Sequence, residues 1–494
     1  MARKKIALDD PLDKVHPQYA EFLDDWCKCR DVIAGEKAVK GKRAKYLPLL
    51  DGKDAQVYQS YLDRALFYNA TARTVDGYEG SVFRKTPEIK LPAIIESMRD
   101  KVDAGGNTLV QFLKQAVTEV IKLNRSGLLL DYPKQAAANE IPYVCHYSAE
   151  DIRDWRTSVI GGRAQLTFLV LAELEDMPGQ NGFGHEVSEI RRVLRLTPPK
   201  TENGVYTYTV ERWKKTADDD KFMQIEPPSE VVIRGNTLDY IPFIFISDDD
   251  LTADVKKPSL IDLVNVNLSH YRTSADLEHG AHYTALPTPA LSGFSEDQRP
   301  GKVPLGPTEA IILPLQGEAK MLEFTGQGLK ALEDRALSKE KMMAVLGARL
   351  LQEQKTGVET AETQRLRQSA DKSILANIVD NVNEAMRRVL KWATVWAGGQ
   401  EPDDKELLVK INDEFFEQML NGVDVVNLVK GWQGGAYSHD SLLRKLQKGG
   451  VIERSPEDER EQMDEEGPPN IPGVTDQLGQ DQNSQDPGGQ NNQP

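Results

Sequence analysis

The sequence predicts an α+β fold in which a helical N-terminal part is followed by an antiparallel sheet, long helices and a polar tail. Residues 128–247 alternate apolar and polar side chains with the period of a strand. Residues 259–283 and 361–396 carry apolar stripes at helical spacing, and the residues after 453 show neither pattern. The 494 residues are enough for about three domain-sized units.

The N-terminal part predicts helices separated by breaks. Apolar and aromatic residues in helical register predict one helix over Gln18–Ile33 and a second over Asp54–Thr71. We expect the second helix to continue towards Tyr78 as one amphipathic element. Another helix fits Thr108–Leu123.

The segment from Leu128 to Ser247 predicts strands joined by turns. Its apolar runs are short, and turn-rich pieces such as PGQNGFG and PPKTENG separate them. We therefore expect an antiparallel sheet with hairpins and no βαβ array. The predicted strands are GLLLDYP, AQLTFLVLAEL, EIRRVLRL, VYTYTVERW and IPFIFIS.

The next segment predicts two helices with a small insert between them. The first spans Ser259–Tyr283, where Ser259 and Asp262 form a variant capping box, and prolines prevent its continuation. Residues 291–324 are a compact insert with short strands in EAIILPL and KMLEF, and the second helix covers Gly328–Gln352. One stripe of the first helix holds Leu260, Val264, Leu268, Tyr271 and Ala275.

The C-terminal part predicts a very long helix and a small final unit. The helix covers Ala361–Trp396, and Gly398 is suited to end it. The final unit over Glu406–Ile452 is expected to hold a strand in LLVKIN and helices around Phe415–Leu420 and Ser438–Lys448.

Charge and composition exclude several classes of protein. The formal net charge is −16, and Glu453–Pro494 contributes 11 acidic and two basic residues, so the acidity is mostly a property of a tail that we expect to be disordered. An acidic chain does not bind nucleic acid through its whole surface, because such binding requires a basic face. No apolar run is long enough for a membrane span, and the basic N-terminus has no apolar segment of a secretory signal. Cys27, Cys29 and Cys145 cannot build a disulfide framework, so synthesis in a reducing cytoplasm is expected.

The sequence offers no strong catalytic or metal-binding motif. A phosphate-binding P-loop, a dinucleotide fingerprint after a strand and a nucleophile elbow are all missing. His279 and His282 share a helix face, but Glu278 precedes them, so the pattern departs from the H-E-x-x-H of zinc enzymes. The pair Trp155–Arg156 is a weak signal for single-stranded nucleic acid, because half the aromatic residues of a sheet are expected to face a core. We therefore predict no catalytic residue, no metal and no cofactor.

The order of these elements resembles the portal proteins of tailed bacteriophages, most of all a branch catalogued as uncharacterised portal-like phage proteins. The similarity covers about Pro17 to Gly399 and rests on order and extent, since no single motif in it is catalytic. The stretches that carry it are Tyr58-x-x-Tyr61-x-x-Arg64-Ala65-x-Phe67-Tyr68-Asn69-Ala70-Thr71, Val82-Phe83-Arg84-Lys85-x-Pro87, Leu260-Ile261-Asp262-Leu263-x-x-x-Asn267-Leu268-x-x-Tyr271, Lys339-Glu340-x-Met342-x-x-x-Gly347-Ala348-Arg349 and Glu359-Thr360-Ala361.

The resemblance implies the portal fold and a division of the chain into its parts. Residues 1–257 would be the N-terminal wing, 258–285 the first stem helix, 286–325 the clip, 326–351 the second stem helix, 352–360 the tunnel loop, 361–400 the long wing helix, 401–455 the crown and remaining wing, and 456–494 the acidic disordered tail.

The resemblance also implies a function without enzymatic activity. It implies a homo-oligomeric ring, usually of twelve subunits, at one vertex of the capsid in the virion, formed in the host cytoplasm and conducting double-stranded DNA without sequence preference. The implied partners are the terminase large subunit, the major capsid protein and scaffold, and adaptor or tail proteins, with no membrane. A monomeric helical adaptor and a metal-dependent hydrolase using Glu278, His279 and His282 stay open as alternatives.

Three groups of residues follow as candidate sites. The stripe of the first stem helix, given above, is expected at the subunit interface. The tunnel loop, whose alternative is an ordinary linker between helices, contains Gln352, Glu353, Gln354, Lys355, Thr356, Gly357, Val358 and Glu359. The partner-docking tip of the clip, whose alternative is a solvated turn, contains Ser295, Glu296, Asp297, Gln298, Arg299 and Lys302.

Overall fold

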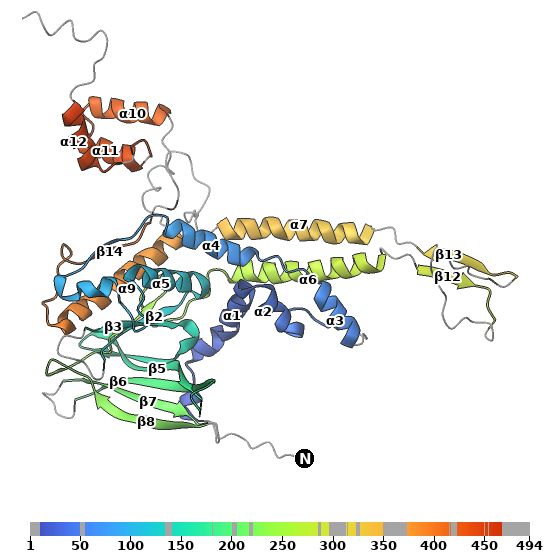
Figure 1. Ribbon diagram of the computed structural model, residues 1–494, viewed down its shortest axis with the longest axis horizontal. Coiled ribbons are helices and arrows are strands. Elements are labelled where there is room, and N and C mark those ends of the chain that lie inside the picture. Colours follow the sequence, from blue (N-terminus) through green and yellow to red (C-terminus); the bar gives the residue numbers. More distant parts are fainter. Residues whose placement is uncertain are drawn as a thin grey trace, which may run out of the picture. The chain divides into compact units, whose positions relative to one another are not determined.

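The computed structural model confirms the mixed α+β class, with helices packed against antiparallel sheets (Figure 1). It divides into two compact units, Met1–Asp413 and Glu414–Pro494, each of which is described by itself. The residues that the structure describes are 10–49, 55–133, 141–179, 181–199, 205–216, 221–284, 288–295, 313, 315–322, 327–348, 373–413, 415, 422–448, 450–452 and 454–466.

The N-terminal part of the first unit is helical, as predicted. Thr108 begins the last of its helices with a capping box, because its hydroxyl accepts from Gln111 N–H while the Gln111 side chain accepts from Thr108 N–H. The helices are η1 (Pro11–Asp13), α1 (Pro17–Ala34), α2 (Glu36–Gly41), η2 (Arg43–Lys45), α3 (Ala55–Arg64), α4 (Ala70–Val82), η3 (Ala93–Arg99) and α5 (Leu109–Leu123).

The prediction of one continuous helix from Asp54 towards Tyr78 is wrong, because α3 and α4 are separate. Asn69 caps α4 through its side-chain oxygen, which accepts from Ala72 N–H at 3.1 Å. Asn267, distant in sequence, accepts from Thr71 N–H and donates to Tyr68 O. These polar groups replace the hydrogen bonds that a continuous helix would have supplied.

Two antiparallel sheets form the β part of the first unit. One has three strands in the order β11-β2-β3 and the other has five in the order β4-β5-β6-β7-β8, so the predicted antiparallel arrangement is confirmed. Their bounds are β2 (Ser126–Asp131), β3 (Tyr143–Ser148), β4 (Ile152–Ile160), β5 (Arg163–Pro178), β6 (His185–Thr197), β7 (Thr207–Lys215), β8 (Phe222–Glu230) and β11 (Phe243–Ile246), with η4 (Ala149–Asp151) between β3 and β4.

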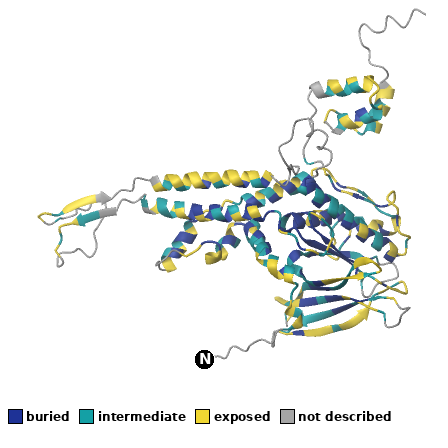
Figure 2. Cartoon of the chain, turned by 180° about the vertical axis from the view of Figure 1, so that it is seen from behind, coloured by how far each residue is buried: buried dark blue, intermediate teal, exposed yellow. Residues whose placement is uncertain are grey.

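The core lies around the three-stranded sheet. α5 and α9 (Ile374–Ala397) pack on β2, and the five-stranded sheet lies beyond the three-stranded one (Figure 1). Leu128, Leu129 and Leu130 are all buried, because both faces of β2 are covered. Figure 2 shows the buried residues gathered in this region.

The long C-terminal helix of the first unit is shorter than predicted. Ser373 has an extended backbone and caps α9, its hydroxyl accepting from Ala376 N–H at 3.2 Å, so α9 begins at Ile374 and the predicted helix is not continuous across Ser373. The predicted part over residues 361–372 lies outside the described residues. Gly398, with a φ of 97°, ends it as expected. The predicted apolar face is buried at Ile378, Val382, Ala385, Val389 and Trp396.

The capping box predicted at Ser259 is also wrong. The Ser259 hydroxyl donates to Asp248 at 2.8 Å, and Asp262 pairs with Lys257 at 2.9 Å. Two short antiparallel pairings also belong to the first unit. They are β1 (Glu88–Lys90) with β14 (Leu408–Lys410), and β9 (Val232–Ile233) with β10 (Asn236–Thr237).

The small final unit predicted over Glu406–Ile452 is divided by the structure. Its strand, β14, belongs to the first unit through its pairing with β1, whereas the second unit contains α10 (Gly422–Gln433), α11 (His439–Lys448) and α12 (Pro456–Glu466). The helix predicted near Phe415–Leu420 lies outside the described residues except for Phe415. The sequence does not predict α10, because Gly422 and Gly431 lower its helix propensity.

Candidate functional site

Helices α6 (Ile261–Thr284) and α7 (Gln327–Ala348) lie side by side (Figure 1). They are antiparallel, since His270 contacts Glu340 at 3.3 Å while Gly280 lies against Leu329 nearer the other end of α7. Lys339 ties the pair together, because its ammonium donates to Ser269 O at 2.9 Å and to the Thr273 hydroxyl. Burial lowers the pKa of His270 below its usual value, so at pH 7 the imidazole is neutral and donates a hydrogen bond to the Glu340 carboxylate without forming an ion pair.

Several N-terminal helices of the same chain hold α6 in place. The Tyr61 hydroxyl of α3 donates to Asp276 at 2.6 Å, and Arg272 donates to Tyr46 O at 2.9 Å. Asn267 joins the link between α3 and α4, as described above. One end of the helix pair is thereby fixed in the body of the first unit.

The structure corrects the assignment of the α6 stripe to a subunit interface. Its five side chains are at most 3% exposed in the single chain, so they pack inside it and offer no surface to a second copy. The spacing of the stripe correctly indicates a buried face, but it does not say what covers that face. The residues are Leu260, Val264, Leu268, Tyr271 and Ala275.

The outer face of α7 is the accessible surface of the pair. Ala336 and Met343 face inwards and are buried, whereas Leu337, Met342 and Val345 are 53%, 50% and 67% exposed. Figure 2 shows exposed residues along most of α7. Exposed apolar side chains interspersed with charges are a surface that another protein can cover.

Strands β12 (Thr288–Ser292) and β13 (Glu318–Leu322) form an antiparallel hairpin between the two helices in sequence. The short strand predicted in KMLEF is thereby confirmed as part of β13, whereas EAIILPL falls largely outside the described residues. Ser295 of the proposed docking tip is exposed. The other docking residues (Glu296, Asp297, Gln298, Arg299 and Lys302) and all of Gln352–Glu359 lie outside the described residues and stay predictions.

His279 and His282, near the C-terminal end of α6, contact side chains of α3. Arg64 Nη2 lies 3.1 Å from His282 Nε2, and the Tyr61 ring meets the His279 ring edge-on at 5.1 Å. A guanidinium beside the imidazole opposes a bound cation. Across the part of the chain that the structure describes, histidines, cysteines and acids do not form a group of three or more that could hold a metal.

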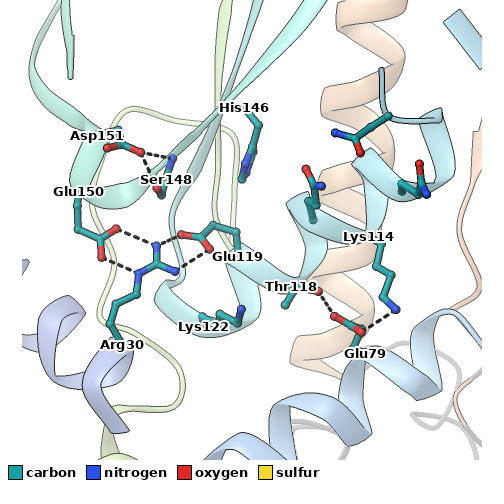
Figure 3. Close-up of a pocket in the computed structure, with 13 residues that line it drawn as sticks. Arg30, Glu79, Lys114, Thr118, Glu119, Lys122, His146, Ser148, Glu150 and Asp151 are labelled. Carbon is teal, nitrogen blue, oxygen red and sulfur yellow. Dashed lines mark hydrogen bonds and ion pairs between the residues drawn. The ribbon is translucent and has the colours of Figure 1, made fainter. Parts of the chain in front are cut away.

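A polar cavity of about 790 Å³ lies where α1, α4, α5, β3 and η4 meet (Figure 3). Arg30 bridges two acids in it, contacting Glu119 and donating through Nε to Glu150 at 2.8 Å. Glu79 accepts from Lys114 at 2.8 Å and from Thr118 at 2.6 Å. These acids already have cationic or hydroxyl partners, so the cluster joins the elements around it.

Sequence reasoning missed this cluster completely. Its members come from segments that are far apart in the chain, and each is an ordinary charged residue within its own helix or loop. The only local signal is the position of Glu119 on the apolar side of α5, where it is buried. A buried charge requires a partner, which the sequence does not identify.

His146, which lines this cavity, makes the stability of the fold depend on pH. Burial lowers its pKa from 6.5 to about 4. The unfolded chain therefore binds a proton that the native chain does not bind, and stability is lost as pH falls below 6.5 until the loss levels off near pH 4. We expect wild type to lose about 2 kcal/mol more than His146→Gln between pH 7.5 and pH 5, measured by urea unfolding.

The control for this prediction is His185→Gln, because the side chain of His185 is 79% exposed on β6. That variant should follow the pH dependence of wild type. Equal slopes for wild type and His146→Gln would show that His146 does not resist protonation in the native state.

The comparisons with known proteins place the helix pair within a matched segment. Residues 259–397 match the family model "Domain of unknown function (DUF4055)", which runs from just before α6 to the last residue of α9. No curated protein matches the chain significantly. Within the residues described, no helix is long and apolar enough to cross a membrane.

Among solved structures, chains of gene transfer agent particles are similar to this chain. One from the virion of the native particle has 12% identity and a TM-score of 0.37, covering 82% of this chain and 95% of that chain. A chain from the neck of the empty particle, computed with C6 symmetry, gives the same values. A chain from the neck of the native particle, computed with C12 symmetry, has 11% identity and a TM-score of 0.37, with coverages of 78% and 92%. At this TM-score the superposition does not establish a common fold.

Proposed function

We propose that this chain is a portal protein, the head–tail connector of a tailed bacteriophage, and that it forms a ring at one vertex of the capsid. The observation that carries the proposal is the pair α6 and α7, whose inner end is fixed in an α+β body and whose helices are joined in sequence through the β12–β13 hairpin. The pair corresponds to a stem and the hairpin to a clip. The sequence resemblance supports the same order of parts.

In this proposal α7 supplies the contact between neighbouring subunits. The proposed contact uses the exposed side chains Leu337, Met342 and Val345, which a neighbouring copy would cover. Burying such side chains in each interface of a closed ring stabilises the assembly through the removal of apolar area from water.

The proposed channel conducts double-stranded DNA without gripping it. Each tight contact between a phosphate and Lys or Arg would release counterions from the DNA. The release would strengthen binding and so slow the movement of DNA. The chain outside the acidic tail at Glu453–Pro494 still carries a negative formal net charge, which agrees with a wall that repels phosphates. The tunnel loop at residues 352–360, which has only Lys355 as a cation, is proposed to make transient contacts with the DNA.

The hairpin region at residues 286–325 is proposed to dock the terminase large subunit during packaging and adaptor or tail proteins afterwards. A loop repeated around a ring presents many equal contacts, and this multiplicity strengthens binding without a new kind of contact. Major capsid protein and scaffold are the proposed partners of the body during assembly in the host cytoplasm.

The test is particle mass together with class averages from electron microscopy. We expect wild type to form closed rings with a central hole, and Leu337→Glu/Val345→Glu to remain at or near the 55.2 kDa monomer, because each new carboxylate would be buried in an interface. The matched control is Val159→Glu/Leu174→Glu, which changes two apolar side chains of the five-stranded sheet that are 77% and 75% exposed. Wild type that stays at 55.2 kDa in the presence of scaffold and capsid protein would refute the ring. Intact rings in the α7 variant would refute only the α7 contact.

A further inference from the structure

A second cavity, of about 890 Å³, lies over the neighbouring strands β4, β5 and β6. The beginning of α1 and the loop at Ala253–Asp254 complete its lining. It includes the pair Trp155–Arg156, which the sequence presents as an isolated aromatic–basic motif. Trp155 is buried, as expected for a sheet aromatic, whereas Arg156 is exposed at the cavity.

Two guanidinium groups flank one aromatic ring in this cavity. The Cζ atoms of Arg156 and Arg195 lie 4.6 and 4.7 Å from the centre of the Phe168 ring. Arg195 pairs with Glu211 at 2.6 Å, but Arg156 has no carboxylate partner among the described residues. Both cations therefore lie against the same ring, contributed from the two strands that pair with β5 on either side.

His16 adds a neutral hydrogen-bond donor to the lining. Its ring stacks on Trp155 at 3.9 Å, and its Nδ1 accepts from Gln18 N–H at 3.3 Å. Burial lowers its pKa below 6.5, so at pH 7 the ring is neutral and its proton is on Nε2. Nε2 has no partner within the described chain.

The guanidinium of Arg125 is buried against Trp155, and only part of its hydrogen-bonding capacity is used. Arg125 is 2% exposed and packs between the rings of Trp155 and Phe245, at 4.3 and 4.8 Å. Its Nη1 donates to Ala253 O, but Nε and Nη2 have no partner. Burial lowers the pKa of Arg125 to about 9, which reflects the cost of this charge.

The acidic and amide groups at the cavity indicate which class of ligand it can bind. Asp254 is the acid of the lining, and its side chain is exposed to solvent, so the lining does not resemble a cation site. The buried oxygen of Gln18 has no partner and can accept a hydrogen bond from a hydroxyl or amine of a ligand.

We propose that this cavity binds an anion with two linked phosphate groups, with Arg156 and Arg195 as its charged contacts and His16 as a neutral donor. Guanidinium groups match phosphate oxygens through paired, charge-assisted hydrogen bonds, and these are stronger than neutral ones. The phosphates can come from a free diphosphate or from a nucleic-acid backbone, which share this chemistry. The proposal does not depend on the portal function.

The test is calorimetric titration of the full-length chain with pyrophosphate and, separately, with a thymidine oligonucleotide of about 20 residues. We expect pyrophosphate to bind once per chain, and Arg156→Gln to weaken it about tenfold or more through loss of a charge-assisted contact. The control is Arg163→Gln, another exposed arginine, on β5 away from the cavity lining, which should bind as wild type does.

Each outcome decides between the alternatives. Binding of pyrophosphate alone identifies a free diphosphate as the source, whereas oligonucleotide binding that pyrophosphate displaces identifies a backbone. No binding of either probe, or equal affinities of the two arginine variants, would overturn the proposal. The melting temperatures of both variants serve as a folding control. We expect them to equal that of wild type, because both arginine side chains are exposed.

Discussion

Replacing Arg192 with methionine is expected to lower the free energy of unfolding by about 3–5 kcal/mol. Arg192 on β6 joins the two sheets, since it donates to Asp131 of β2 at 2.6 Å and lies 3.5 Å from Glu173 of β5. Its side chain is only 12% exposed. Its removal leaves the poorly solvated Asp131 without a cation and Glu173 with only the more distant Arg212, at 3.8 Å, so most of the desolvation of these carboxylates is no longer offset.

Hydroxyl donors do not replace the lost charge. Tyr143 donates to Asp131 at 2.9 Å and Tyr147 donates to Glu173 at 2.6 Å, but both bonds already exist in the native chain. Neutral donors stabilise a carboxylate less than a guanidinium does. The stability of Arg192→Lys should therefore lie between those of wild type and Arg192→Met. Lysine keeps the positive charge but lacks the paired N–H donors of the guanidinium.

The measurement is urea unfolding at one protein concentration, so that any assembly affects all variants alike. Arg388→Met is the matched control, since Arg388 pairs with Glu384 on the exposed side of α9, with both side chains largely solvated. That control should change stability by less than about 0.5 kcal/mol. If the two methionine variants prove equally stable, the ion pair between the sheets contributes nothing.

Replacing Asn267 with leucine is the second large effect, an expected loss of about 2–4 kcal/mol. Asn267 is fully buried on α6, and its side-chain oxygen accepts from Thr71 N–H at 3.2 Å and from the Thr71 hydroxyl at 2.8 Å. Its nitrogen donates to Tyr68 O at 2.8 Å. Leucine has a similar size but no polar group, so the first turn of α4 keeps its buried groups without partners.

The effect should be local as well as global. We expect faster hydrogen exchange at Thr71 and the beginning of α4 in Asn267→Leu, because the acceptor of Thr71 N–H is lost while the Asn69 cap remains. Asn265→Leu is the control on the same helix, where the side chain is exposed and the change should be within about 0.5 kcal/mol. Unaltered exchange at Ala70–Val82 in Asn267→Leu would rule out this capping role.

The sequence determined those elements whose signals are local. The helix predicted over Thr108–Leu123 is found as α5, Gly398 ends α9 as expected, and period-two runs mark the strands of both sheets. Each of these depends on residues within a few positions of one another, so hydrogen bonding and periodicity suffice to predict it.

Only the tertiary structure decided what each buried face and each charge contacts. The α6 stripe is buried within its own chain, the break between α3 and α4 is held by Asn267, and the Ser259 hydroxyl binds Asp248 instead of capping α6. The partners of Arg30 and Arg192 lie on other elements as well. Periodicity fixes which face of an element must leave water, but the partner is chosen by packing among segments that are distant in sequence.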